Sequence, residues 1–163
     1  GTGLNLLDFG CIRVFPPVFV EGVVDLYRAL QKEDFDATYA AYEKWGFDGL
    51  SKELVEVLNI WARFIYGPLL DDRVRSVADG VTSGEYGRKE AFAVRKLLKE
   101  KGPVKIPREF VFMDRAAIGL GAAYLRLGAE LNYCRLFEES LEGFSVEAVA
   151  KRQADALKAA GLT

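Results

Sequence analysis

The sequence contains no histidine, and this absence removes several classes of active site at once. Without an imidazole there is no Ser-His-Asp nucleophile, no histidine general base and no zinc site that needs a histidine ligand. Any catalysis by this chain must therefore depend on carboxylate, lysine, arginine or tyrosine side chains.

Cysteine is scarce, and excess charge of one sign is absent. Cys11 and Cys134 are the only cysteines, and they lack the spacing of a metal knuckle or a redox pair, which predicts a reducing, cytoplasmic setting. We interpret Cys11 as a small packed side chain rather than a reactive thiol. The 22 basic and 24 acidic residues give a net charge of -2, without the clustered basic excess of a nucleic-acid-binding protein. Nucleic acid is therefore excluded as a partner.

Long hydrophobic runs are missing as well. The longest uncharged apolar run, residues 116–125, is roughly half of the length that a membrane-spanning helix needs. With 50% hydrophobic and 28% charged residues, the chain nevertheless has enough apolar material for one packed domain.

What the sequence does contain is a helical pattern over most of its length. Ser51 and Ser145 are suited to cap helices at the N-terminus, and Gly46 and Gly102 to end them. Apolar residues at the 3.6 period predict helices over about 16–30, 34–45, 51–66, 89–101, 107–127, 132–141 and from 145 onward, with a loop over 71–87.

The predicted fold class is mainly α. We expect a single domain over residues 1–163, in which a short strand at 4–7 and a turn occupy residues 1–15 and a helical bundle occupies 16–163. The final helix, rich in Ala and Lys, should be exposed.

Two helices carry features that allow two interpretations. Asp114 and Arg115 interrupt an apolar helix, and we favour a buried ion pair or hydrogen-bond anchor over a surface for a substrate or a partner. That helix carries an apolar stripe and a second stripe of small residues: Phe110, Met113, Ala117, Leu120, Tyr124 and Leu127, and then Ala116, Gly119 and Ala123. A stripe of aromatic residues elsewhere suits a core better than a lipid or quinone pocket, the alternative: Phe35, Tyr39, Tyr42 and Trp45.

Asp8-Phe9-Gly10 is the segment that carries chemistry. In kinase-like phosphoryl transfer the Asp of such a turn binds the Mg²⁺ that bridges the nucleotide phosphates, and the Gly allows a sharp turn. The apolar run before Asp8 supplies a strand that would deliver it to a site. The tripeptide alone also fits an ordinary β-turn.

Two segments resemble the UbiB/AarF family of atypical protein-kinase-like proteins. Leu-Asn-Leu-Leu-Asp-Phe-Gly-Cys-Ile-Arg, residues 4–13, looks like the segment around that family's metal-binding turn. Residues 106–110, 114–121 and 131–137 are similar to the family's last helices, and the Lys-Trp-Gly-Phe turn at 44–47 also looks like the family. The resemblance covers nearly the whole chain.

The resemblance implies the C-terminal part of a kinase-like lobe. It implies a kinase or ATPase in the full-length protein, linked to ubiquinone biosynthesis, with Asp8 as a ligand of the Mg²⁺ that accompanies ATP and Arg13 as a contact to a phosphate or a carboxylate. The nucleotide-gripping loop, the Lys-Glu pair and the catalytic loop would lie upstream of Gly1, so we expect this fragment alone to be inactive and to bind neither cofactor tightly.

The same resemblance implies partners. These are the upstream part of the same protein and an isoprenoid or quinone lipid or a membrane surface, with a peripheral place at the inner face of a membrane. Apolar surface left uncovered would also favour a homo-oligomer. The alternative is a stand-alone all-helical module that binds a lipid or a partner protein, in which Asp8-Phe9-Gly10 is incidental.

Overall fold

The computed structural model describes residues 12–102 and 104–162. The predicted strand at 4–7, the Asp8-Phe9-Gly10 turn and Cys11 lie outside the described residues, so those predictions stay predictions.

The described chain is mainly α-helical, as predicted. It forms seven α-helices, one 3₁₀ helix and two short strands. In chain order these are α1 (Pro17–Lys32), α2 (Phe35–Lys44), α3 (Lys52–Tyr66), η1 (Gly67–Leu70), β1 (Arg75–Ser76), α4 (Arg88–Lys101), α5 (Arg108–Arg126), β2 (Glu130–Leu131), α6 (Tyr133–Leu141) and α7 (Val146–Ala159).

Side-chain caps fix where several helices begin. The Ser51 hydroxyl accepts a hydrogen bond from the backbone N–H of Leu54 at 3.2 Å, and the Ser145 hydroxyl accepts one from Ala148 at 3.0 Å. Each cap satisfies an N–H that has no partner inside the helix. Both predicted caps are confirmed.

Glycine ends α4 as the sequence predicts. Gly102 follows the last helical residue with φ of 120°, a backbone conformation that side chains with a Cβ rarely adopt. The boundary is therefore set by local backbone chemistry.

A two-stranded antiparallel sheet is present that was not predicted from the sequence. Arg75 of β1 pairs with Leu131 of β2, and Ser76 pairs with Glu130. This sheet attaches the connection between α3 and α4, predicted as a loop, to the turn between α5 and α6. Strands of two residues carry no periodicity that a sequence pattern can reveal.

The core lies among α1, α2 and α3, with aromatic side chains at its centre. Tyr27, Tyr42 and Phe47 are almost completely buried. Gly22 of α1 lets the Trp45 ring approach the helix backbone, because a Cβ at Gly22 would lie 2.7 Å from the indole Cδ1 atom. Close packing of α1 on α2 therefore depends on a missing side chain.

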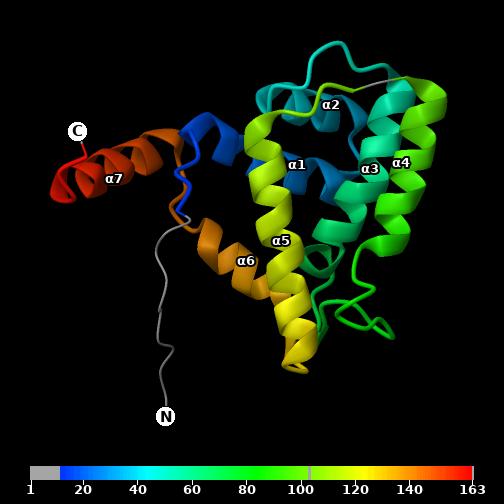
Figure 1. The fold of residues 1–163 in the computed structure, drawn as a ribbon. Helices are drawn as coiled ribbons and strands as arrows, with labels where there is room; N and C mark the ends of the chain where they lie inside the picture. Colours follow the sequence, from blue (N-terminus) through cyan, green and yellow to red (C-terminus); the bar gives the residue numbers. More distant parts are fainter. Residues whose placement is uncertain (1–11, 103, 163) are drawn as a thin grey trace.

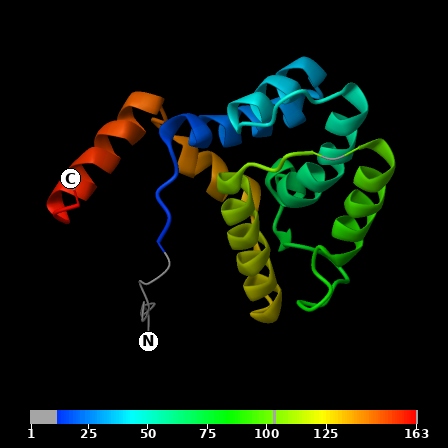
Figure 2. The ribbon, with the colours of Figure 1, turned by 45° about the horizontal axis from the view of Figure 1, so that its top comes forward.

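The remaining helices cover this core from different sides. α4 lies beside α3, and α5 crosses the face formed by α1 and α3 (Figure 1). A second view shows α5 and α4 on either side of α3, with α6 behind the upper end of α5 (Figure 2). α7 projects away from the body, and Val149 is its one buried residue, so the predicted exposure of the last helix is confirmed.

The predicted apolar stripe of α5 is wrong in its second half. Phe110 and Met113 pack against the core, but Leu120 is 58% exposed and Leu127 is 78% exposed. The inward face runs through Gly121 instead, where the Tyr86 ring lies against the helix backbone. Gly121 has no side chain, so it adds no apolar residue to the periodic pattern. The inward face of α5 could therefore not be recognised from the sequence.

None of the helices in the described ranges is both long enough and apolar enough to cross a membrane.

Candidate functional site

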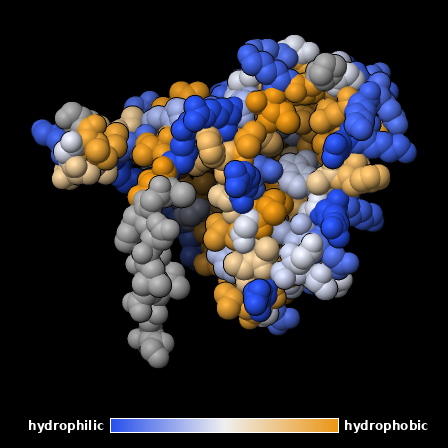
Figure 3. Space-filling view, in the orientation of Figure 1, coloured by the Kyte–Doolittle hydropathy of each residue, from blue (hydrophilic) through white to orange (hydrophobic). Residues whose placement is uncertain are grey.

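An apolar cavity lies between α3, α4 and α5. Its volume is about 910 Å³, and core residues of α1 and α2 form its floor. Apolar side chains gather on the upper part of this face, between α5 and α4 (Figure 3). Cavities of this size and character are those that hold small organic ligands.

The α4 wall of the cavity is incompletely packed. No residue of α4 is buried, although Ala91, Val94 and Leu98 form an apolar stripe that lines the cavity. Protein interiors are normally filled at the density of organic crystals. An amphipathic helix whose apolar stripe stays partly open therefore faces a space that another group can fill.

Tyrosine hydroxyls in the wall of the cavity are already hydrogen-bonded within the protein. The Tyr42 hydroxyl donates to Asn59 Oδ1 at 2.9 Å, and the Tyr66 hydroxyl donates to the backbone carbonyl of Val23 at 3.1 Å. Burial raises the pKa of both phenols above their usual range. Neither hydroxyl hydrogen is therefore free for a ligand.

The two tryptophans of the chain also line the cavity, with their N–H groups engaged. Trp45 Nε1 donates to the backbone carbonyl of Phe19 at 3.1 Å, and Trp61 Nε1 donates to Asp114 Oδ1. The aromatic wall thus presents ring faces and edges rather than free polar atoms.

Asp114 places a carboxyl group in this apolar wall. Burial raises the pKa of Asp114, and the hydrogen bond from Trp61 partly offsets that rise. The hydrogen bond joins α5 to α3, which confirms the predicted anchor. A buried ion pair, the other form of anchor that was predicted, is not observed: in the described chain neither Asp114 nor Arg115 has an oppositely charged side chain at ion-pair distance, and Arg115 is exposed.

Arg95 and Lys99 bring positive charge to the α4 side of the cavity. They are four residues apart, so they lie on one face of the helix, and both are exposed. Within residues 12–102 and 104–162, neither side chain has a carboxylate at ion-pair distance. Neither residue was predicted from the sequence as part of a site, although cations next to an apolar stripe at 91, 94 and 98 are a signal that the sequence contains.

The aromatic stripe of α2 divides between core and cavity. Tyr42 and Trp45 are buried in the core and also line the cavity. Phe35 and Tyr39 are partly buried and pack against that core. The core interpretation is confirmed for this stripe, and a lipid or quinone ligand stays a prediction.

Arg13 contacts a carboxylate, but one that belongs to α5. Its Nη2 atom lies 2.6 Å from Glu109 Oε1, and its guanidinium carbon lies 5.0 Å from the centre of the Phe112 ring. The pKa of Glu109 is lowered, first by a hydrogen bond from its own backbone N–H and then by the contact with Arg13. A phosphate contact of Arg13 stays a prediction, as does the metal-ligand role of Asp8, which lies outside the described residues.

Two further polar contacts have structural roles. The Tyr27 hydroxyl of α1 donates to Glu138 Oε1 of α6 at 2.6 Å, and Asp72 forms an ion pair of 2.8 Å with Arg135. Both connect α6 to the body.

In the part of the chain that the structure describes, no group of three or more Cys, Asp or Glu side chains is placed to hold a metal ion.

Comparison with known proteins identifies no relative. No protein family, curated protein or solved structure matches this sequence.

Proposed function

We propose that this chain is the C-terminal part of a kinase-like lobe that resembles the UbiB/AarF family. In the full-length protein Asp8 binds the Mg²⁺ of a Mg-nucleotide, and the activity is that of an ATP-dependent kinase or ATPase linked to ubiquinone biosynthesis. Its partners are the upstream part of the same protein and a membrane-associated isoprenoid or quinone lipid. This fragment alone is inactive.

One observation supports the proposal beyond the sequence resemblance itself. The two segments that carry the resemblance, residues 4–13 and 106–137, are far apart in sequence, yet Arg13 of the first forms an ion pair with Glu109 of the second. The Phe112 ring adds a cation–π contact to the same guanidinium. In an active site built from both segments, such a contact would hold the chain that follows the metal-binding turn.

The test is Asp8→Asn in the full-length protein, with Asp48→Asn as the control. Asp48 is an exposed carboxylate at a distance from the turn in sequence. We expect D8N to abolish Mg-nucleotide binding and hydrolysis and D48N to leave both unchanged. Of these two aspartates, Asp8 is the one proposed to bind the metal. Unchanged hydrolysis in D8N would remove the assignment. The gene upstream of Gly1 should encode a catalytic loop of the His-x-Asp type followed by an Asn.

The cavity favours a second candidate function, the binding of an apolar ligand. Titration with the neutral dye Nile red tests it, with Ala117→Phe and Ala116→Phe as a matched pair. Ala117 lines the cavity, whereas its neighbour Ala116 is exposed outside the lining. We expect the dye to bind the unmodified chain and A116F but not A117F, because the new ring fills the cavity. Equal binding of the dye by both variants would show that the dye binds outside this cavity and would contradict the proposal.

A further inference from the structure

The charges around the cavity restrict which ligand suits it. Among the lining residues, Arg95, Lys99 and Asp114 are the charged ones. The first two belong to α4 and the third to α5, so positive charge is concentrated on one wall. An apolar ligand with one polar end would therefore enter in a defined orientation.

We propose that the cavity binds a free fatty acid, whose single acyl chain fills the apolar space and whose carboxylate lies against Arg95 and Lys99. This inference rests on the second candidate function, the binding of an apolar ligand, and adds the chemical class of that ligand.

The two cations favour an anionic head. Side chains four residues apart on a helix are neighbours, so Arg95 and Lys99 repel each other. Lys101 on the same helix has Glu53 as a partner at 3.6 Å, but no carboxylate in the described chain pairs with Arg95 or Lys99. A carboxylate bound between these two side chains would remove the repulsion and accept hydrogen bonds from both.

The rest of the lining disfavours other heads. The hydroxyls of Tyr42 and Tyr66 and the indole N–H groups of Trp45 and Trp61 donate to protein atoms, so they offer no donor to an alcohol. A quaternary ammonium would need Asp114 as its counter-ion. That carboxylate already accepts a hydrogen bond in an apolar wall, where ionisation is costly.

The apolar wall suits an acyl chain. Each methylene that moves from water to such a wall raises affinity about fourfold. A chain between α4 and α5 would contact the half-open stripe of α4, including Val94 and Leu98. The ligand would thus complete the packing of a helix that has no buried residue of its own.

Intrinsic fluorescence measures occupancy directly, because Trp45 and Trp61 are the only tryptophans and both line the cavity. The probes are decanoate, decanol and decyltrimethylammonium, each titrated below its micelle concentration. We expect decanoate to bind most tightly. R95Q/K99Q should weaken decanoate about tenfold, since two charge-assisted contacts are lost, and leave decanol unchanged.

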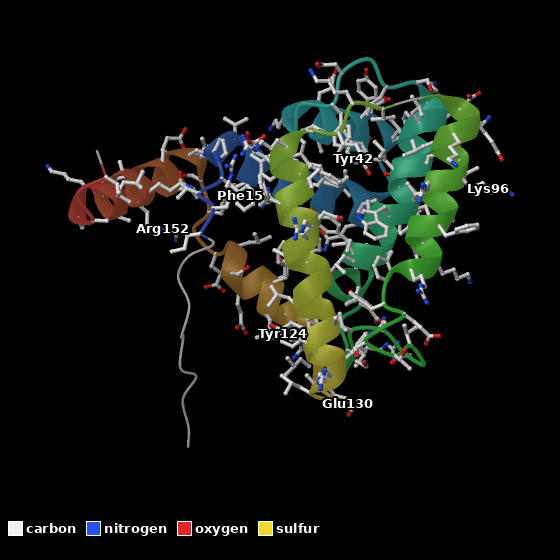
Figure 4. The ribbon with its side chains drawn as sticks, in the orientation of Figure 1. Phe15, Tyr42, Lys96, Tyr124, Glu130 and Arg152 are labelled. Carbon is white, nitrogen blue, oxygen red and sulfur yellow. The ribbon has the colours of Figure 1, made fainter. Side chains whose placement is uncertain are left out.

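The matched control is K89Q/K96Q, which removes two exposed cations of α4 that do not line this cavity. Lys96 lies on the outer side of α4, turned away from α5 (Figure 4). We expect this control to bind decanoate like the unmodified chain. Equal weakening in both double variants would mean unspecific charge attraction and overturn the inference.

The remaining outcomes separate this inference from the function it rests on. Decanol or the ammonium binding as tightly as decanoate would overturn the fatty-acid assignment and leave an apolar-ligand site. No fluorescence response to any of the three probes would overturn both. Binding to phosphatidylglycerol vesicles without binding of monomeric decanoate would identify a membrane surface as the partner. That result would also overturn the fatty-acid assignment.

Discussion

The indole N–H of Trp61 in α3 donates a hydrogen bond to the carboxylate of Asp114 in α5. Both residues line the apolar cavity, and they are separated by more than fifty positions in sequence. The bond fixes α5 against α3 and leaves the space towards α4 open. It is the contact that most directly connects the stability of the fold to the shape of the candidate site.

Replacing Asp114 tests this anchor. We expect Asp114→Ala to lower the free energy of unfolding by about 1–2 kcal/mol, because the partly buried Trp61 N–H loses its acceptor. Asp114→Asn keeps an oxygen at the same place and should cost less. Urea unfolding of the three proteins measures the difference. Equal losses in both variants would show that the carboxylate acts through something other than this hydrogen bond.

The same carboxyl should make stability depend on pH. Its pKa is raised from the ordinary value of 3.8 by burial. Below the unfolded-state pKa the acid is protonated in both states, and its contribution to stability is fully present; that contribution is lost as pH rises through the folded-state pKa. We therefore expect the stability of the unmodified chain relative to D114N to fall as pH rises above about 4 and then to level off. A difference that is constant with pH would contradict the raised pKa.

Gly121 and Gly119, two residues apart on α5, should respond to alanine in opposite ways. A Cβ on Gly121 would overlap the ring of Tyr86, whereas a Cβ on Gly119 would meet nothing within 4 Å. We expect G121A to destabilise the fold by about 1–3 kcal/mol through overpacking. G119A should stabilise it by about 0.5–1 kcal/mol, because alanine is the better helix former. Thermal unfolding of both variants checks the prediction, and a stable G121A would refute the close contact.

Tyr27 should be a strong point of attachment for α6. Its buried hydroxyl donates to Glu138 and accepts a hydrogen bond of 2.8 Å from Gln31 Nε2. Burial, followed by the bond to Glu138, raises the pKa of this phenol above its usual range. We expect Tyr27→Phe to cost about 1–3 kcal/mol, because a bond to a charged acceptor is lost.

Glu138→Gln is the control for that change. It keeps an acceptor for the Tyr27 hydroxyl and should therefore lose less stability than Tyr27→Phe. Chemical unfolding followed by circular dichroism measures both variants. A larger loss in Glu138→Gln would assign the attachment to the charge of Glu138 rather than to the tyrosine hydroxyl.

Helix positions could be predicted from the sequence to within a few residues. Ser51 and Ser145 cap their helices and Gly102 ends α4, because these effects depend on groups a few positions apart. The two-residue strands could not be predicted, since their pairing joins Arg75 to Leu131 across the fold.

The candidate site could be predicted only in fragments. A charge within an apolar helix identified Asp114 as an anchor, but nothing in the pattern named Trp61 as its partner. Tyr42 and Trp45 were expected in the core, where they lie. Arg95 and Lys99 were missed, because a cation on a helix is ordinarily a solvated side chain and becomes notable only beside a cavity.

By itself the sequence determined that this chain is mainly helical, where its helices begin and end to within a few residues, and that no residue of the chain can supply an imidazole. Only the tertiary structure decided that α5 turns Gly121 inward, that Arg13 meets Glu109, and that a cavity opens between α3, α4 and α5. The physical reason is the range of the forces involved. Caps and backbone preferences act within one turn of a helix, whereas a filled or open space depends on the summed volumes of side chains from six α-helices.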